Sequence, residues 1–222
     1  FKLTHVPSAL SMLTYIDVLF SEKLIVPYRD KIVLGKPFGS QAYYVVWRKN
    51  SYIKNIDSLS VGVKSHEIDF VDYSEETMGN ALGVGCGIAM ANPGIKTWIN
   101  ITDGTLQMGS TLEAIQYIGH NAIKNIIVTV DKNNYQVTGE TSSVLSVDAV
   151  IDFFANNKWN VVVCDGHDPI KIQNSFPQNS KLPTVIIFNT IKGYGVPYME
   201  NNPVEWHYKP IENYETSYNF CN

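Results

Sequence analysis

One aspartate–glycine pair and one asparagine have the residue types and the spacing that chemistry could use. Asp103 and Gly104 end one apolar run, and Asn133 ends the next one, thirty positions further on. An Asp-Gly pair usually forms a hairpin turn, but the segment after Gly104 has helical periodicity. One carboxylate with neutral oxygens suits Mg²⁺ or Ca²⁺ when a ligand's phosphate oxygens and water complete the shell. A helix that starts after Gly104 adds backbone N–H groups for such a phosphate.

Each of these residues also has a purely structural explanation. Asp103 could cap the following helix, and Asn133 could belong to the turn KNNYQ. Taken together, at matching strand ends and one βαβ unit apart, the two residues favour a metal–diphosphate site.

The elements that would position this pair alternate along the chain. The pattern predicts strands at 96–102, 125–131, 159–164 and 183–189, and helices at 108–120, 146–157 and 168–174. Nearly apolar strands that alternate with helices indicate the α/β class, with a doubly wound parallel sheet and helices on both faces. Ligands of such sheets bind at the carboxyl ends of the strands, where Asp103 and Asn133 fall.

The flanking segments are less regular, and we expect one domain over residues 1–222. Residues 1–60 form an N-terminal helical segment, in which a polar link (26–39) separates two helices. Residues 193–222 form an aromatic-rich C-terminal tail that resembles an ordered loop. The further helices that the pattern predicts are 8–20, 39–48 and, lined by small residues, 78–91.

Composition argues against several classes of protein. The net charge is -4 without a Lys/Arg-rich block, which gives no support to a nucleic-acid partner. No apolar run approaches the roughly 18 residues of a membrane helix, and the first residues do not read as a signal peptide. Cys86, Cys164 and Cys221 are scattered and form no C-x-x-C pair, so we expect reduced thiols in a cytoplasmic protein.

The segment TDGTLQMGSTLEAIQYIGHNAIKNIIVTVDKNNYQVTGET closely resembles the thiamine-diphosphate motif of transketolases, which opens with Gly-Asp-Gly about thirty residues before an Asn. Five more segments are similar to that family in the same order, between residue 4 and about residue 210. They are THVPSALSML, DKIVLGKPFGSQAYYVV, VDYSEETMGNALGVGCGIAMA, WNVVVCDGHD and TIKGYGVPYMENNPVEWH. The resemblance implies the thiamine-diphosphate-binding fold, as the domain that holds the diphosphate (the PP-type domain).

The resemblance also implies roles for the matching positions. Asp103, Asn133 and the main-chain oxygen of Tyr135 would hold the Mg²⁺ or Ca²⁺ ion. Gly104 and the N–H groups after it would hold the diphosphate. The positions implied to contact the cofactor are His66, Met78, Gly79, Asp103, Gly104, Thr105, Asn133 and Lys192.

Three histidines align with family histidines near the reacting end of the cofactor: His5, His66 and His207. Ketol transfer needs proton shuttles at the substrate hydroxyls, and neutral imidazoles suit that work near pH 7, while the cofactor supplies the carbanion chemistry. Two of them have an alternative: His66 could be a surface residue, and His5 could be frayed. We interpret His120, at a helix end, and His167, in a turn, as structural.

The sequence departs from the family pattern at five positions. Phe38 replaces a histidine, which predicts an altered substrate or mechanism. Glu75 and Glu76 replace Thr-Gly, and we expect their carboxylates to point away from the diphosphate or to bind a substrate hydroxyl or amine. Met108 replaces a glutamate of the family's buried acidic network, and Thr102 replaces the first glycine of Gly-Asp-Gly.

The family activates its cofactor with a glutamate on a separate pyrimidine-binding domain, for which 222 residues leave no room. The resemblance therefore implies one half of a split transketolase, active only with a pyrimidine-domain subunit in an expected α₂β₂ assembly. Such an enzyme would move a two-carbon ketol unit between sugars or modified sugars. Two alternatives stay open: a thiamine-dependent carboligase similar to deoxyxylulose-phosphate synthase that uses a 2-oxoacid, and a non-catalytic binding homologue. A plain Rossmann domain is disfavoured because no G-x-G-x-x-G follows the first strand.

Overall fold

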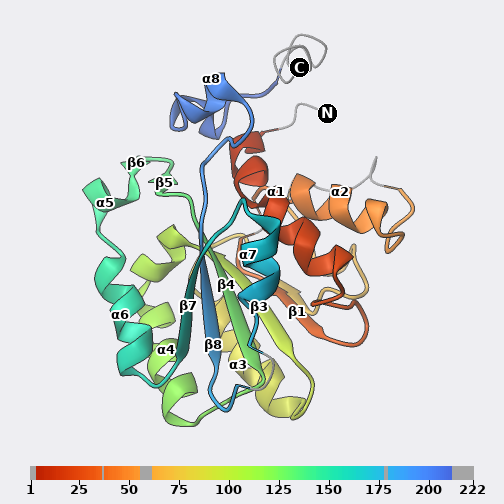
Figure 1. The fold of residues 1–222 in the computed structure, drawn as a ribbon, viewed down its shortest axis with the longest axis vertical. Helices are drawn as coiled ribbons and strands as arrows, with labels where there is room; N and C mark the ends of the chain where they lie inside the picture. Colours follow the sequence, from red (N-terminus) through yellow and green to blue (C-terminus); the bar gives the residue numbers. More distant parts are fainter. Residues whose placement is uncertain (1–3, 37, 56–61, 178–179, 212–222) are drawn as a thin grey trace.

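A six-stranded sheet in the order β2-β1-β3-β4-β8-β7 forms the centre of the molecule, and every neighbouring pair in it is parallel (Figure 1). The computed structural model describes residues 4–36, 38–55, 62–177 and 180–211. The strands of this sheet are β1 (Lys31–Leu34), β2 (Tyr73–Ser74), β3 (Thr97–Thr102), β4 (Ile126–Lys132), β7 (Asn160–Asp165) and β8 (Thr184–Asn189). A separate antiparallel pair joins β5 (Tyr135–Gln136) and β6 (Gly139–Glu140).

The helices lie on both faces of the sheet, as predicted for a doubly wound fold (Figure 1). One hydrophobic cluster joins the sheet to α1, α2 and α7, and a second joins it to α3, α4 and α6. The helices are α1 (Val6–Ser21), α2 (Gln41–Lys49), α3 (Ala81–Ala91), α4 (Gly109–His120), α5 (Thr141–Val144), α6 (Asp148–Asn156), α7 (Pro169–Asn174) and α8 (Pro197–Glu200), with 3₁₀ turns η1 (Asp103–Gln107) and η2 (Glu205–His207).

The burial of each strand follows its place in the sheet. Strands β4 and β8 are buried along nearly their whole length, because helices cover both sides of the sheet centre. Strand β7 lies at the edge, and its Val163 side chain is exposed.

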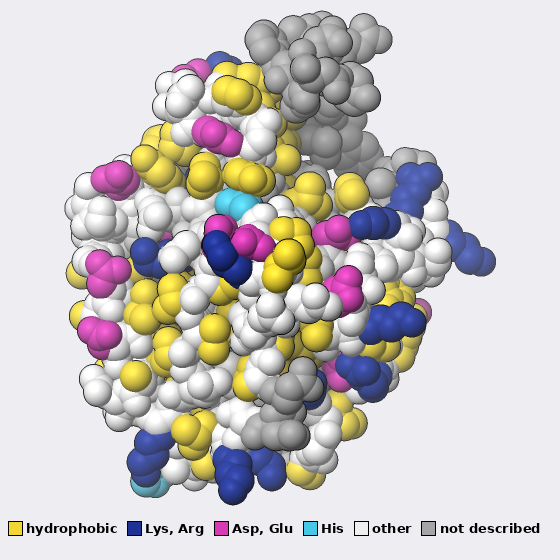
Figure 2. All heavy atoms as spheres, in the orientation of Figure 1, with side chains coloured by type: hydrophobic (Ala, Val, Ile, Leu, Met, Phe, Trp, Pro, Cys, Tyr) yellow, Lys and Arg dark blue, Asp and Glu magenta, His cyan; other side chains and the backbone are white. Residues whose placement is uncertain are grey.

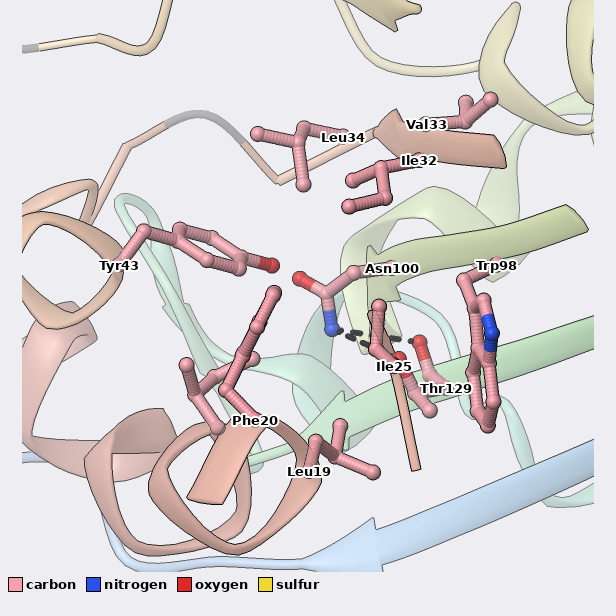
Figure 3. A pocket seen from close by; sticks show the side chains of 11 residues that line it. Leu19, Phe20, Ile25, Ile32, Val33, Leu34, Tyr43, Trp98, Asn100 and Thr129 are labelled. Carbon is pink, nitrogen blue, oxygen red and sulfur yellow. Dashed lines mark hydrogen bonds between the residues drawn. The ribbon is translucent and has the colours of Figure 1, made fainter. Parts of the chain in front are cut away.

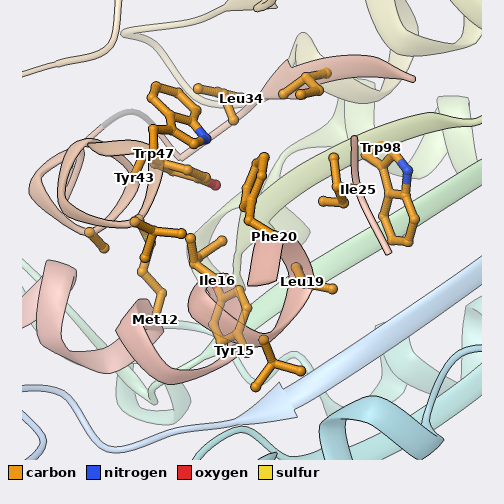
Figure 4. Packing of buried hydrophobic residues seen from close by; sticks show 14 of the residues in the cluster. Met12, Tyr15, Ile16, Leu19, Phe20, Ile25, Leu34, Tyr43, Trp47 and Trp98 are labelled. Carbon is orange, nitrogen blue, oxygen red and sulfur yellow. The ribbon is translucent and has the colours of Figure 1, made fainter. Parts of the chain in front are cut away.

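Helix α1 packs through large side chains against α2 and the sheet. Met12, Tyr15 and Phe20 of α1 are fully buried, and Figure 4 shows Phe20 lying between α2 and the strand that carries Trp98. The Tyr15 ring stacks on Phe188 of β8, with 4.5 Å between ring centroids. These contacts fix the start of α1, and with it His5, relative to the strand ends.

A glycine lets α3 lie close against the sheet. A Cβ atom added to Gly85 would stand 2.4 Å from the Ile99 side chain of β3. A small residue therefore allows the close approach of this helix to the sheet at this position. The helix itself is shorter than the predicted 78–91, since it begins only at Ala81.

The prediction of a polar link between the first two helices is wrong for residues 31–34. These residues form β1, which lies inside the sheet between β2 and β3. Only four residues long, the apolar run KIVL is a weak local signal, and hydrogen bonding to strands on both sides makes it a strand. The correction matters because Lys36 follows this strand.

Two observations concern the surface and the thiols. The face seen in Figure 2 carries Lys and Arg side chains mostly at its lower and right-hand edges, without a continuous basic surface. Across the described residues, none of the helices combines the length and the apolar character needed to cross a membrane.

Cys86 and Cys164 are buried free thiols. Cys221 and the end of the predicted tail (212–222) lie outside the described residues.

Candidate functional site

A cavity of about 530 Å³ lies at the carboxyl ends of the strands, and His5, just before α1, and His207 of η2 are among its lining residues. Figure 1 shows the beginning of α1 above this edge of the sheet. The loop after β8 is tied to the start of α1, because the Gly193 N–H donates to the Pro7 carbonyl at 3.0 Å. The lining residues are His5, Ser8, Gly35, Lys36, Phe38, Glu76, Thr77, Met78, Thr102, Asp103, Gly104, Gln107, Met108, Asn133, Tyr135, Gln136, Val137, Thr138, Lys192, His207 and Tyr208.

Asp103 is a buried carboxylate directly after β3, held only by neutral donors. Its Oδ1 accepts from the Thr102 hydroxyl at 2.9 Å and from the Gly104 N–H at 2.8 Å. Its Oδ2 accepts from the Asn134 N–H at 2.8 Å and from the Thr141 hydroxyl at 3.2 Å. Burial, and then the nearby charge of another aspartate, raise the pKa of Asp103 above its usual value. Its carboxylate carries a negative charge into the cavity wall that a cation would stabilise.

Asn133 and Tyr135 bring neutral oxygens to the same wall. The Asn133 side chain is buried, and its Oδ1 accepts from the Tyr135 N–H at 3.1 Å. The carbonyl oxygen of Tyr135 accepts from the Lys192 ammonium at 3.3 Å, so this oxygen already faces a cationic group. The structure thus brings together the three residues predicted to hold the metal.

The donor set fits a hard divalent cation that shares its shell with a ligand. Among the described residues, no group of three or more His, Cys, Asp or Glu side chains could hold a metal by itself. No ion pair within the described ranges includes Asp103. One uncompensated carboxylate with amide and carbonyl oxygens matches the sparse protein shell of an ion that keeps phosphate and water ligands.

Gly104 and Lys192 could accommodate the phosphate groups of such a ligand. A Cβ atom on Gly104 would stand 3.3 Å from the Gln136 Oε1 atom and 3.6 Å from the Met78 Sδ atom, so glycine keeps this wall open. The Lys192 side chain is buried, and burial, followed by the charge of Lys36, lowers its pKa to about 8. A phosphate in the cavity would stabilise its charged form.

Two of the three predicted histidines, His5 and His207, lie beside each other in the cavity lining. His5 begins α1 in a left-handed conformation (φ 59°), and its ring stacks on Phe38 with centroids 4.7 Å apart. The His207 ring lies 5.4 Å from His5, and its Nδ1 is 2.7 Å from the Lys192 Nζ. Tyr208 packs edge-on against His5 at 4.8 Å.

Both imidazoles are held neutral by their surroundings. Burial, and then the charge of Lys192, lower the pKa of His5 to about 4 and that of His207 to about 3. Since an ammonium can only donate, the Nδ1 of His207 must accept, which leaves the proton on Nε2. Both rings are therefore neutral at neutral pH and each has a nitrogen that can accept a hydrogen bond, although pKa values this low make them weaker bases than an ordinary histidine.

Three predicted site residues do not line the cavity. His66 lies exposed in the turn that precedes Phe70, so the structure does not place it beside the other histidines. Gly79 follows Met78 in the chain and has a φ of 118°, and its carbonyl accepts from the Ser110 hydroxyl at 2.7 Å. Thr105 is fully buried beneath Gly104. The roles predicted for these three residues stay predictions.

The positions that depart from the family pattern behave differently from one another. Glu75 is buried and accepts from the backbone N–H groups of Gly79 at 3.2 Å and Asn80 at 2.9 Å, so its carboxylate caps the start of α3. Burial raises the pKa of Glu75 although these hydrogen bonds act against it. Glu76, in contrast, is exposed and lines the cavity. Phe38, Thr102 and Met108 also line the cavity.

A second, water-sized void of about 10 Å³ lies in the core beneath α1. Figure 3 shows Tyr43 and Asn100 pointing toward each other across it, among aliphatic side chains. It is too small for a substrate, so the cavity at the strand ends is the candidate site.

Sequence reasoning missed two charged residues of this site, Lys36 and Asp131. They form an ion pair that lies fully inside the protein. Asp131 stands two positions before Asn133, and Lys36 follows a strand that the sequence pattern did not reveal. The sequence signal that could have revealed them is a charged residue at or just after the end of an apolar run.

Comparisons with known proteins show the family of this chain. Residues 91–218 match the family described as "Transketolase, thiamine diphosphate binding domain". The first of two similar proteins is one subunit of the apulose-4-phosphate transketolase of Phocaeicola vulgatus. It is 28% identical over 220 residues, which cover 90% of this chain and 78% of that protein. The second, Rattus norvegicus transketolase, is 25% identical over 198 residues, covering 83% of this chain and 32% of that protein.

A solved structure has the same fold. The transketolase from Leishmania mexicana superimposes with a TM-score of 0.78 at 19% identity, over 88% of this chain and 34% of that chain. The present chain therefore spans about a third of the length of the transketolases of Rattus norvegicus and Leishmania mexicana, and most of the length of the Phocaeicola vulgatus protein.

Proposed function

Because this chain belongs to the family of the transketolase thiamine diphosphate binding domain, we propose that it is the diphosphate-binding half of a two-subunit transketolase. Residues 1–222 would form a single domain of this type. The complete enzyme transfers a two-carbon ketol unit between sugars or modified sugars, and a separate chain supplies the pyrimidine-binding domain. The similarity to a protein that is itself named as one subunit of a transketolase supports the division into two chains.

The observation that carries the proposal is the buried Asp103 carboxylate, which faces the cavity without an ion-pair partner among the described residues. Asp103, the Asn133 side-chain oxygen and the Tyr135 carbonyl would hold Mg²⁺ or Ca²⁺. Gly104 and Lys192, with Met78, Gly79, Thr105 and His66 as predicted further contacts, would receive the thiamine diphosphate. That cofactor, when bound, supplies the carbanion chemistry of ketol transfer.

The histidines of the cavity lining support the choice of reaction. The rings of His5 and His207 are neutral, so each can form hydrogen bonds with a substrate hydroxyl. Phe38 adds an apolar ring beside His5, which favours a substrate with fewer hydroxyls at that point, such as a modified sugar. An α₂β₂ assembly is the arrangement we propose for the enzyme. The buried free thiols of Cys86 and Cys164 support a cytoplasmic location.

Calorimetric titration of thiamine diphosphate into the protein, with Mg²⁺ and with a chelator, tests the cofactor assignment. We expect binding that needs the metal and that Asp103→Ala abolishes. Asp165→Ala is the matched control, because Asp165 also ends a strand of the sheet but is exposed and lies outside the cavity. Normal metal-dependent binding by Asp103→Ala would contradict the site.

The reaction is tested on the complex with the pyrimidine-domain chain. We expect a ketose donor to be consumed and a two-carbon unit to appear on an aldose acceptor. Consumption of pyruvate with release of carbon dioxide would instead indicate the carboligase. A complex that binds the cofactor and turns over neither donor would indicate a non-catalytic homologue.

A further inference from the structure

An ion pair between Lys36 and Asp131 lies fully inside the protein, next to the predicted metal ligands. The two side chains are 6% and 0% exposed, and each other ion pair of the described residues has at least one partly exposed side chain. Burying both charges costs free energy that their attraction offsets only when other hydrogen bonds complete the arrangement. The function proposed above assigns no role to this ion pair.

The hydrogen bonds around Asp131 are complete and come from distant parts of the chain. Its Oδ2 accepts from the Lys36 ammonium and, at 2.7 Å, from the Ser11 hydroxyl of α1. Its Oδ1 accepts from the Thr190 hydroxyl at 2.6 Å. Lys36 uses its other donors on the Ser8 carbonyl at 3.1 Å and the Ser11 hydroxyl at 3.3 Å. The carboxylate is therefore held rigidly in one orientation.

The same carboxylate decides which way the Asn133 amide points. The Asn133 Nδ2 lies 2.8 Å from the Asp131 Oδ2. An ionised carboxylate can only accept hydrogen bonds, so the nitrogen, and not the oxygen, must face it. The Asn133 oxygen is thereby turned to the side where it meets the Tyr135 N–H, and Asn133 lines the cavity.

We propose that Asp131 is a positioning residue for the metal site: its carboxylate, held by Lys36, Ser11 and Thr190, locks the Asn133 amide with its oxygen available to the cation. The inference rests on the proposed function, because it takes Asn133 as a metal ligand. Lys36 acts through Asp131, since it neutralises a charge that otherwise would be buried alone. Second-layer partners of this kind orient metal ligands and usually change metal affinity by about 10- to 100-fold when removed.

The test measures Mg²⁺ affinity calorimetrically at saturating thiamine diphosphate. Asp131→Asn alone leaves the Lys36 ammonium unpaired, so the informative variant is Lys36→Met/Asp131→Asn, which removes both charges. An amide at position 131 can donate or accept a hydrogen bond. It can therefore pair with either the nitrogen or the oxygen of the Asn133 side chain, and Asn133 is no longer held in one orientation. We expect Mg²⁺ to bind about 10- to 100-fold more weakly, while the melting temperature without metal stays near that of the wild type.

A second comparison separates orientation from general structure. In the Lys36→Met/Asp131→Asn background, Asn133→Asp restores a ligand whose two oxygens both accept, so its orientation no longer matters. In that background we expect Asn133→Asp to raise Mg²⁺ affinity by roughly fivefold or more. In the wild-type background we expect no such gain, because the new carboxylate at position 133 would face the carboxylate of Asp131. An equal effect in both backgrounds, or wild-type affinity in Lys36→Met/Asp131→Asn, would overturn the proposal.

The two proposals fail in different ways. If Asp103→Ala keeps metal-dependent cofactor binding, the metal site itself is misassigned. If Asp103→Ala loses binding and Lys36→Met/Asp131→Asn does not weaken it, the metal site stands and the positioning role of Asp131 falls. Asp165→Asn, at the exposed end of the edge strand β7, is the control that should change neither.

Discussion

Two buried aspartates, Asp103 and Asp131, lie at the ends of neighbouring strands, and they differ in the groups that contact their carboxylates. Asp131 in β4 lies opposite Thr102, the residue before Asp103. Lys36 pairs with Asp131, whereas only neutral N–H and O–H groups donate to Asp103 in the described structure. Burial raises the pKa of Asp103. Burial alone would do the same to Asp131, but the charge and hydrogen bond of Lys36, together with hydrogen bonds from Thr190 and Ser11, outweigh it and lower the pKa of Asp131.

The difference shows how one sheet edge can hold both a structural and a binding carboxylate. Asp131 has its counter-charge within the protein, so it stabilises the fold and keeps its neighbours in place. Asp103 forms no ion pair among the described residues and interacts with the charge of Lys192 only at longer range, so a bound cation would stabilise its charge. We therefore expect the same substitution to cost much more stability at Asp131 than at Asp103.

Asp131→Asn should produce the largest loss of stability. The variant leaves a buried ammonium without its carboxylate, which typically costs about 3–5 kcal/mol. Urea unfolding of the metal-free protein measures the effect, and Lys36→Met/Asp131→Asn should recover most of it. A loss below about 1 kcal/mol would show that the pair is not needed for the fold.

Asp103→Asn should cost less stability than Asp131→Asn in the metal-free protein. Removing the buried charge of Asp103 favours the variant, since burial raises the pKa of this carboxyl, but the amide NH₂ group would face one of the two backbone N–H donors that bind the carboxylate. Urea unfolding at several pH values checks this: the cost of the variant relative to the wild type should be largest at low pH, where Asp103 is protonated, and should shrink as pH rises through the folded pKa.

Ligands should stabilise the wild type more than Asp103→Asn. Thiamine diphosphate with Mg²⁺ stabilises only the form that binds it, so the melting temperature of the wild type should rise when both are present, while that of the variant should change little. Thermal unfolding with and without the two ligands checks this. An equal rise in the variant would contradict the metal role of Asp103.

The smallest expected effect concerns the histidines beside Lys192. With pKa values of about 4 for His5 and about 3 for His207, both rings should stay neutral throughout the neutral range in nitrogen NMR spectra. Lys192→Met should raise the pKa of His207 part of the way to its ordinary value, because burial is the larger cause and the lysine charge the second. Titration of either ring near its ordinary pKa of about 6.5 in the wild type would contradict the assignment.

Much of this arrangement follows from local sequence. The alternation of apolar strands with helices predicted β3, β4, β7 and β8 to within one residue at each end. The thirty-residue interval between Asp103 and Asn133 spans one βαβ unit, and the structure places both residues in one cavity wall. Local periodicity and the geometry of parallel sheets suffice for such predictions.

Other features have no local signature. Strand β1 is four residues long and is a strand because it pairs with two neighbours. His66 matched a family histidine by its place in the sequence, yet the structure leaves it exposed and away from the cavity lining.

The sequence by itself determined the fold class, the family and the meeting of Asp103 with Asn133 at the strand ends, because these depend on periodicity and on short motifs. Only the tertiary structure decided which carboxylate has a counter-charge. Lys36 and Asp131 are 95 positions apart, and their pairing requires β1 and β4 to lie on either side of β3. The charge left on Asp103, and the orientation of Asn133, follow from that distant contact rather than from the residues beside them.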